Sequence, residues 1–144
     1  MIDATEDRLR LSRYCPWLRA AAAYNALWGG LVVLFPGAVF ALIGAPAPSY
    51  RPLWQVVGML VMLYAPAYWW ASRDPVRHRH LVLIGLAGKV LGPAGFAWSL
   101  ATGQLPAGFA LVILTNDLLW WPAFGLFVRD AARVGGWPAL LRGE

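Results

Sequence analysis

Charged residues are scarce in this chain. They make up 13% of its 144 residues, whereas a soluble globular domain carries about 25%. Hydrophobic residues make up 60%, and nine tryptophans are present. Such a composition excludes an ordinary soluble domain, because too few polar side chains remain to cover its surface. The proportions favour an integral membrane protein, and the length fits a single domain, taken as residues 1–144.

Cysteine and histidine are nearly absent, which excludes several kinds of site. Cys15 is the only cysteine, so an intrachain disulfide, a redox CxxC pair and a cysteine metal cage are all excluded. The two histidines, His78 and His80, lie in the segment RHRH, where neighbouring arginines repel cations. We therefore expect no metal site in this protein.

Long polar stretches are also rare, and four apolar runs take their place. A helix needs about 20 apolar residues to cross the hydrocarbon core of a bilayer. Strands of a membrane barrel would show alternating hydrophobicity, which these runs lack. The sequence thus predicts an all-α integral membrane fold, an antiparallel bundle of four transmembrane helices. The predicted spans cover about 17–35, 53–71, 81–101 and 107–128.

Basic residues are nearly missing from one side of this predicted bundle. Ten arginines precede the first span, join the second to the third or follow the fourth, while Arg51 alone lies on the other side. Cytoplasmic loops of membrane proteins carry such an excess of basic residues, so we expect both termini in the cytoplasm. We therefore attribute the net charge of +5 to residues that orient the protein in the membrane and contact anionic lipid headgroups. Nucleic acid is not an expected partner.

Proline and glycine interrupt the chain after the first predicted span. Pro36 and Gly37 end the first helix, and the segment AVFALIG at 38–44 is too short to cross a bilayer. Further prolines up to residue 52 prevent a long continuation. This pattern predicts a short half-helix at the outer membrane interface.

Polar side chains are rare inside the spans but collect at one depth. Lys89, the only lysine, is ten residues from Arg79 and so about 15 Å into the membrane. Asp117 is twelve residues from Arg129, which places it at about 18 Å. An isolated charge at this depth is costly, so we expect Lys89 and Asp117 to pair inside the bundle. The same layer holds the other candidate ligand-binding residues: Asn116, Asn25, Tyr24, Tyr64, Trp28, Trp120 and Trp121.

Small residues and prolines near Lys89 favour a cavity beside it. Gly88 and Gly92 form a GxxxG pair, which lets a neighbouring helix approach closely. Pro93 lacks the N–H that would bond the carbonyl of Lys89, so this carbonyl is expected to accept from another group. Prolines in the second and fourth spans free carbonyls in the same way, and kinks at these positions would open space between the helices.

Three segments carry a resemblance to a known group of proteins: YNALWGG at 24–30, GKVLGP at 88–93 and NDLLWWPAF at 116–124. They resemble a family of small four-span bacterial membrane proteins without an established function. The helix count and the proline-led break after the first span are also loosely similar to DoxX-like proteins. The resemblance implies a bacterial inner membrane location and, because DoxX-like proteins are associated with quinone-linked redox work, a membrane-soluble partner. The cofactor stays open, with a quinone as the candidate. Peroxide-reductase chemistry, attached to some members by name, is excluded here by the single cysteine.

The polar layer favours one function and leaves others open. We expect binding of an apolar small molecule, such as a quinone or an isoprenoid, by an accessory or redox-partner subunit. One alternative is a dimeric proton-coupled transporter that uses the Lys89–Asp117 pair. Another is a lipid-modifying membrane enzyme, since an acid, an amine and a phenol can support acid–base chemistry. The pair could also be a helix clamp without a ligand. Expected partners are the bilayer, the ligand and either a second copy or a membrane redox protein.

Overall fold

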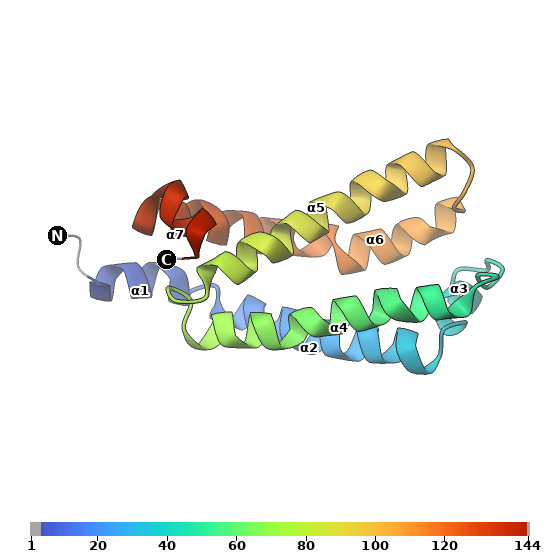
Figure 1. The fold of residues 1–144 in the computed structure, drawn as a ribbon, viewed down its shortest axis with the longest axis horizontal. Coiled ribbons are helices and arrows are strands. Elements are labelled where there is room, and N and C mark those ends of the chain that lie inside the picture. The colour runs from blue at the N-terminus through green and yellow to red at the C-terminus, as the bar shows by residue number, and fades with distance from the viewer. Residues whose placement is uncertain (1–3, 144) are drawn as a thin grey trace.

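Every regular element of the part of the chain that the structure describes, residues 4–143, is helical in this computed structural model (Figure 1). The predicted all-α class is therefore confirmed. The elements in chain order are α1 (Ala4–Ser12), α2 (Cys15–Leu34), α3 (Ala38–Leu42), α4 (Arg51–Arg73), α5 (Arg79–Ala101), η1 (Ala107–Phe109), α6 (Ala110–Asn116), η2 (Leu118–Trp120) and α7 (Trp121–Arg142).

Two helical stretches are long and apolar enough to cross a membrane, namely Arg79–Ala101 and Ala107–Arg142. Helices α2 and α4, with 20 and 23 residues, match the first two predicted spans in position. Both fall short in hydropathy, because strongly polar residues, among them Arg19, Asn25 and Gln55, lie within them. The described chain therefore has two candidate spans, and the four-span bundle stays a prediction.

The fourth predicted span, 107–128, is not one continuous helix. Helix α6 ends at Asn116, a short 3₁₀ turn follows, and α7 continues from Trp121 well past residue 128 to Arg142. The sequence predicts only a kink from the proline of this span, Pro122, whereas the break lies earlier, at Asp117, after the polar residues Thr115 and Asn116. The short helix predicted after the first span is present as α3.

Helices α2 and α4 form one closely packed pair, which Figure 1 shows as two helices side by side. The backbones meet at two glycines. A Cβ atom added to Gly29 would lie 2.6 Å from the carbonyl oxygen of Gly58, and one added to Gly58 would lie 2.8 Å from Val32 Cβ. Only glycine allows so close an approach between two helices.

Helix α5 packs along α6 and α7 to form the second half of the bundle (Figure 1). The main core joins the two halves toward the end where α1 and both chain ends lie. Phe124 and Phe127 of α7 are fully buried there with Tyr68 of α4, which is 2% exposed. A second core at the opposite end gathers α3, η1 and α6 around Phe40 and Phe109.

The C-terminal segment folds back onto the bundle instead of leaving it. The helix kinks at Gly136, whose φ of 78° lies in the left-handed region that favours glycine. The last turns then bury Leu140 completely in the main core. One glycine kink and one buried leucine therefore make this segment part of the fold.

Candidate ligand-binding site

The break between α6 and α7 places polar backbone groups inside the bundle. At Asp117 the backbone leaves the helical region, with φ −121° and ψ −64°. The N–H of Trp120 donates to the carbonyl of Asp117, three residues back, at 3.1 Å. A continuous α-helix would instead bond that N–H to the carbonyl of Asn116. The break therefore leaves the Asn116 carbonyl available to a partner outside the helix.

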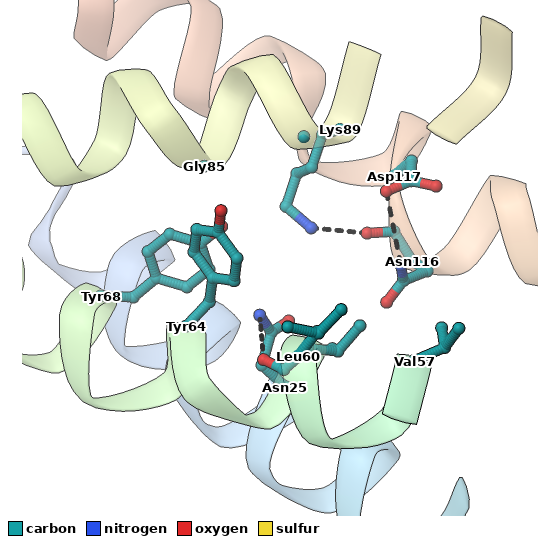
Figure 2. A pocket seen from close by; sticks show the side chains of 11 residues that line it. Asn25, Val57, Leu60, Tyr64, Tyr68, Gly85, Lys89, Asn116 and Asp117 are labelled. Carbon is teal, nitrogen blue, oxygen red and sulfur yellow. Dashed lines mark hydrogen bonds between the residues drawn. The ribbon is translucent and has the colours of Figure 1, made fainter. Parts of the chain in front are cut away.

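Lys89 supplies that partner. Its Nζ donates to the carbonyl oxygen of Asn116 at 2.6 Å, and its side chain is only 5% exposed (Figure 2). The ion pair that the sequence predicts between Lys89 and Asp117 is not formed within 4.0 Å among the described residues. The prediction of direct pairing is therefore wrong. The Asp117 side chain instead accepts from Asn116 Nδ2 at 3.3 Å, and Gly92 leaves room for its carboxylate against α5.

Two tryptophans donate to further backbone carbonyls near the break. Trp121 Nε1 donates to the carbonyl of Lys89 at 2.9 Å. This is the carbonyl that Pro93 was predicted to release, so the prediction that it accepts from another group is confirmed. Trp120 Nε1 donates to the carbonyl of Thr115 at 3.0 Å. Lysine and indole donors thus satisfy the backbone where the helices are irregular, as buried polar groups require.

A cavity of about 160 Å³ lies beside Lys89, between the α2–α4 pair and α5–α6 (Figure 2). Two acceptors close to it have no hydrogen-bond partner, Asn25 Oδ1 and Asn116 Oδ1, and both atoms are buried. The Asn25 amide is held by its Nδ2, which donates to the Val61 carbonyl at 3.2 Å. The lining residues are Asn25, Val57, Leu60, Val61, Tyr64, Tyr68, Gly85, Gly88, Lys89, Asn116 and Asp117.

Five of the nine predicted site residues line this cavity: Asn25, Tyr64, Lys89, Asn116 and Asp117. The other four do not. Tyr24 and Trp120 stack with ring centroids 5.5 Å apart, and Trp120 lies behind Lys89, whose Nζ is 5.8 Å from the ring. Trp121 is 39% exposed and reaches the site only through its bond to the Lys89 carbonyl. Trp28 lies elsewhere, packed against Trp54 in the second core.

Trp28 lies about one helical turn beyond Asn25 on α2, toward α3. Asn25 donates to the Val61 carbonyl of α4 and lines the cavity, whereas Trp28 packs against Trp54 in the second core. Counting residues from the arginines put both side chains in one layer, but contacts between helices decide which side chains share the site.

Tyr68 and Phe124 are parts of the site that the sequence did not single out. Tyr68 lines the cavity, with its ring centroid 5.0 Å from that of Phe124, and Phe124 lies 5.8 Å from Lys89 Nζ. Gly85 makes room for the Tyr68 hydroxyl, because a side chain at Gly85 would collide with it. Spacing offered one usable signal: Tyr68 is one helical turn from Tyr64 and so shares its face of α4.

A second polar cluster lies where α1 meets α7 and was not predicted at all. The Asp130 side chain is 1% exposed and accepts from the Tyr14 hydroxyl at 2.7 Å. Arg13 bonds both the Asp130 carboxylate and the Tyr14 oxygen, while Arg129 and Arg133 lie 3.3 and 3.5 Å from Asp130. The cluster ties together residues more than a hundred positions apart and holds the start of the chain against α7.

The pKa values of this cluster reflect its contacts, and both groups lie outside the predicted spans. Burial raises the pKa of Tyr14, and its bond to the Asp130 carboxylate raises it further. Burial also acts to raise the pKa of Asp130, but hydrogen bonds from Tyr14, Arg13 and Arg129 outweigh it and the pKa falls below its usual value. Asp130 is therefore ionised at neutral pH and binds the neutral phenol as an acceptor.

The arrangement at Lys89 suits a neutral ligand with hydrogen-bonding oxygens better than a metal ion. The residues from 4 to 143 contain no group of three or more histidine, cysteine or carboxylate side chains that could hold a metal. The cavity offers an amine donor, two amide oxygens without partners and phenol groups within a mostly apolar wall. These groups can orient a carbonyl or hydroxyl by hydrogen bonding.

Comparisons of this chain with protein-family models, with curated proteins and with solved structures found no match. The site therefore has to be interpreted from its own geometry.

Proposed function

We propose that this protein is a four-span integral membrane protein that binds a membrane-soluble small molecule of the quinone type in the cavity beside Lys89. It would serve as an accessory or redox-partner subunit in a bacterial inner membrane. The observation that carries the proposal is a buried amine next to a cavity with two buried, unpartnered amide oxygens. Buried polar groups without partners are rare in folded proteins and mark places where a ligand or water completes the bonding.

The outer surface of the bundle supports a membrane location for all four long segments. Large apolar side chains face outward on each of them, beyond the two stretches that qualify by hydropathy. Monomeric soluble proteins rarely expose a continuous apolar surface of this kind, whereas lipid tails would cover it without cost. Examples from α2, α4, α5 and α6 are Leu27 at 75% exposure, Leu63 at 67%, Leu91 at 70% and Leu114 at 53%.

The distribution of charge supports the proposed orientation. The two chain ends lie at the same end of the molecule, together with α1 and the turn between α4 and α5 (Figure 1). Ten of the eleven arginines belong to segments at or near that end. An inner-membrane protein with cytoplasmic termini would place these arginines beside anionic headgroups. The second core, with α3 and the turn after α5, would then face the outer leaflet.

The chemistry of the cavity fits both redox forms of a quinone head. The Lys89 amine can donate to a quinone carbonyl while keeping its bond to Asn116. Asn116 Oδ1 and Asn25 Oδ1 can accept from the hydroxyls of a quinol, which would satisfy both orphan acceptors. Tyr64 and Tyr68 contribute flat apolar faces to the wall. We prefer binding to the transporter alternative, since Lys89 and Asp117 form no ion pair within 4.0 Å in the described part of the chain.

A leucine at Gly88 is expected to fill the cavity and weaken binding at least tenfold. Gly88 lines the cavity, and a Cβ atom there would have no neighbour within 4 Å, so the added side chain starts in open space. Leucine also has a higher helix propensity than glycine, so the fold is kept. The measurement is the quenching of tryptophan fluorescence by a short-chain benzoquinone added to the purified protein.

Gly95→Leu is the matched control for this experiment. Gly95 lies in the same helix and also has open space at its Cβ position, but it does not line the cavity. This variant is expected to bind the benzoquinone like the wild type. Equal affinities for Gly88→Leu and Gly95→Leu would show that the quinone binds elsewhere or not at all, and the proposal would be lost.

A further inference from the structure

A second cavity, of about 380 Å³, lies at the end of the bundle opposite the chain termini. We call it the outer groove. Its walls come from α4, from α3 with the loop that follows it, and from the turn after α5; among them are Phe40, Leu53, Trp54, Leu105 and Phe109. None of the residues that line it is charged. The groove is thus larger and more apolar than the cavity beside Lys89.

The two cavities share a wall. Val57 of α4 lines both the outer groove and the cavity beside Lys89. Along α4 the lining residues Leu53, Val57, Leu60 and Tyr64 follow one another at steps of three or four residues, so they occupy one face of the helix. Val57 is 37% exposed, so the wall that the two cavities share lies at the surface of the bundle.

We infer that the outer groove holds the apolar chain of the molecule whose head group lies beside Lys89. This inference rests on the proposed function and makes it more specific: the ligand has a polar head and a long apolar chain, bound lengthwise along α4. Eleven residues separate Tyr64 from Leu53, so a chain of about 16 Å would reach from one cavity into the other. In the proposed orientation the chain points toward the outer leaflet.

The position of the bound apolar chain tests this inference better than the affinity of the ligand does. Lipid tails are as apolar as the groove, so moving a chain from lipid into the groove gains little hydrophobic free energy. The shape of the groove instead sets the direction in which the bound ligand lies. The experiment therefore uses two photoreactive benzoquinones with the same twelve-carbon chain. One carries a diazirine on the ring and the other carries it at the end of the chain.

Both probes are irradiated with the full-length protein in lipid nanodiscs, and labelled peptides are mapped by mass spectrometry. The ring probe is expected to label residues around the Lys89 cavity. The chain-end probe is expected to label the outer groove, at peptides containing Leu53, Trp54 or Phe109. Labelling by the chain-end probe at the opposite end, near Trp69, or spread evenly over lipid-facing residues would overturn the inference while leaving the head-group site intact.

Leu53→Trp tests the outer groove itself, because Leu53 lines the groove and not the cavity beside Lys89. The indole is expected to fill the groove and to reduce chain-end labelling at Phe109 at least fivefold, while ring labelling by a benzoquinone without a chain is unchanged. Leu63→Trp is the matched control, because Leu63 is 67% exposed on α4 and lines neither cavity. Unchanged groove labelling in Leu53→Trp would contradict the inference. Absence of specific labelling by both probes in the wild type would remove the proposed function together with it.

Discussion

Replacement of Gly29 by leucine is expected to prevent α2 and α4 from packing, whereas replacement of Gly30 is expected to leave the fold intact. A Cβ atom at Gly29 would lie 2.6 Å from the Gly58 carbonyl oxygen and 2.8 Å from Met62 Cβ. The carbonyl belongs to the backbone and cannot turn aside, so the helices must separate. Overpacking of a core destabilises a protein by about 1–3 kcal/mol, and we expect a clash with backbone to cost at least the upper value of this range.

Gly30 is the natural control because it is the next residue of the same helix and has nothing within 4 Å of its Cβ position. The two variants have the same composition and differ only in the face of α2 that they change. Retention on a size-exclusion column and the midpoint of thermal unfolding in detergent would compare them. A Gly29→Leu protein as stable as Gly30→Leu would mean that the close α2–α4 contact is absent from the protein in solution.

Loss of the Asp130 carboxylate is expected to release α1 from α7. In Asp130→Ala the Tyr14 hydroxyl stays buried without an acceptor, and Arg13, Arg129 and Arg133 lose their shared partner. An unsatisfied buried hydroxyl costs about 1–3 kcal/mol. Loss of the contacts between Asp130 and the three arginines adds little to this cost, because the arginine side chains are half exposed to solvent. We expect a loss of about 2 kcal/mol in the free energy of unfolding at pH 7.

The contribution of Asp130 to the stability of the fold decreases as the pH falls. The pKa of Asp130 is lower in the folded protein than its usual value near 4, so its contribution to stability is complete above that value. As the pH falls through the folded pKa the carboxyl takes up a proton and the contribution is lost. The difference in unfolding temperature between the wild type and Asp130→Ala should therefore shrink from pH 7 to pH 3.

Asp74→Ala provides the comparison for this measurement. Asp74 also contacts an arginine of α1, Arg8, at 3.6 Å, but its side chain is 33% exposed. Exposed pairs contribute about 0–1 kcal/mol, so this variant should differ little from the wild type. Equal losses of stability in Asp74→Ala and Asp130→Ala would contradict the role assigned to Asp130. A difference in unfolding temperature between Asp130→Ala and the wild type that does not change with pH would contradict it as well.

The sequence was most informative where one residue acts on its own helix. Proline at 93 was enough to predict a free carbonyl at Lys89, because the missing N–H is a local property. Counting residues from the basic ends placed Lys89 and Asn116 at one depth, and the structure brings them into contact. The short helix after the first span followed from its flanking prolines and glycine in the same way.

The features that were missed depend on several segments at once. The break at Asp117 turns the carbonyl of Asn116, rather than the Asp117 carboxylate, toward Lys89. The expected ion pair assumed a continuous helix at that point. Asp130 and Tyr14 are 116 residues apart, and no spacing pattern relates them. Trp28 packs against Trp54 of α4 in the second core, and this contact between helices does not follow from its position along α2.

The central claim is that Lys89 binds the head of a small molecule, and native mass spectrometry tests it most directly. The protein would be released from membranes without added ligand, as the wild type and as Lys89→Met. We expect a co-purifying quinone or isoprenoid adduct in the wild type and its loss in the variant. The circular dichroism spectrum of the variant should stay close to that of the wild type, although its unfolding temperature falls because the Asn116 carbonyl loses its donor. An adduct retained in Lys89→Met, or a bare wild-type protein whose variant unfolds, would contradict the account and make Lys89 a helix clamp.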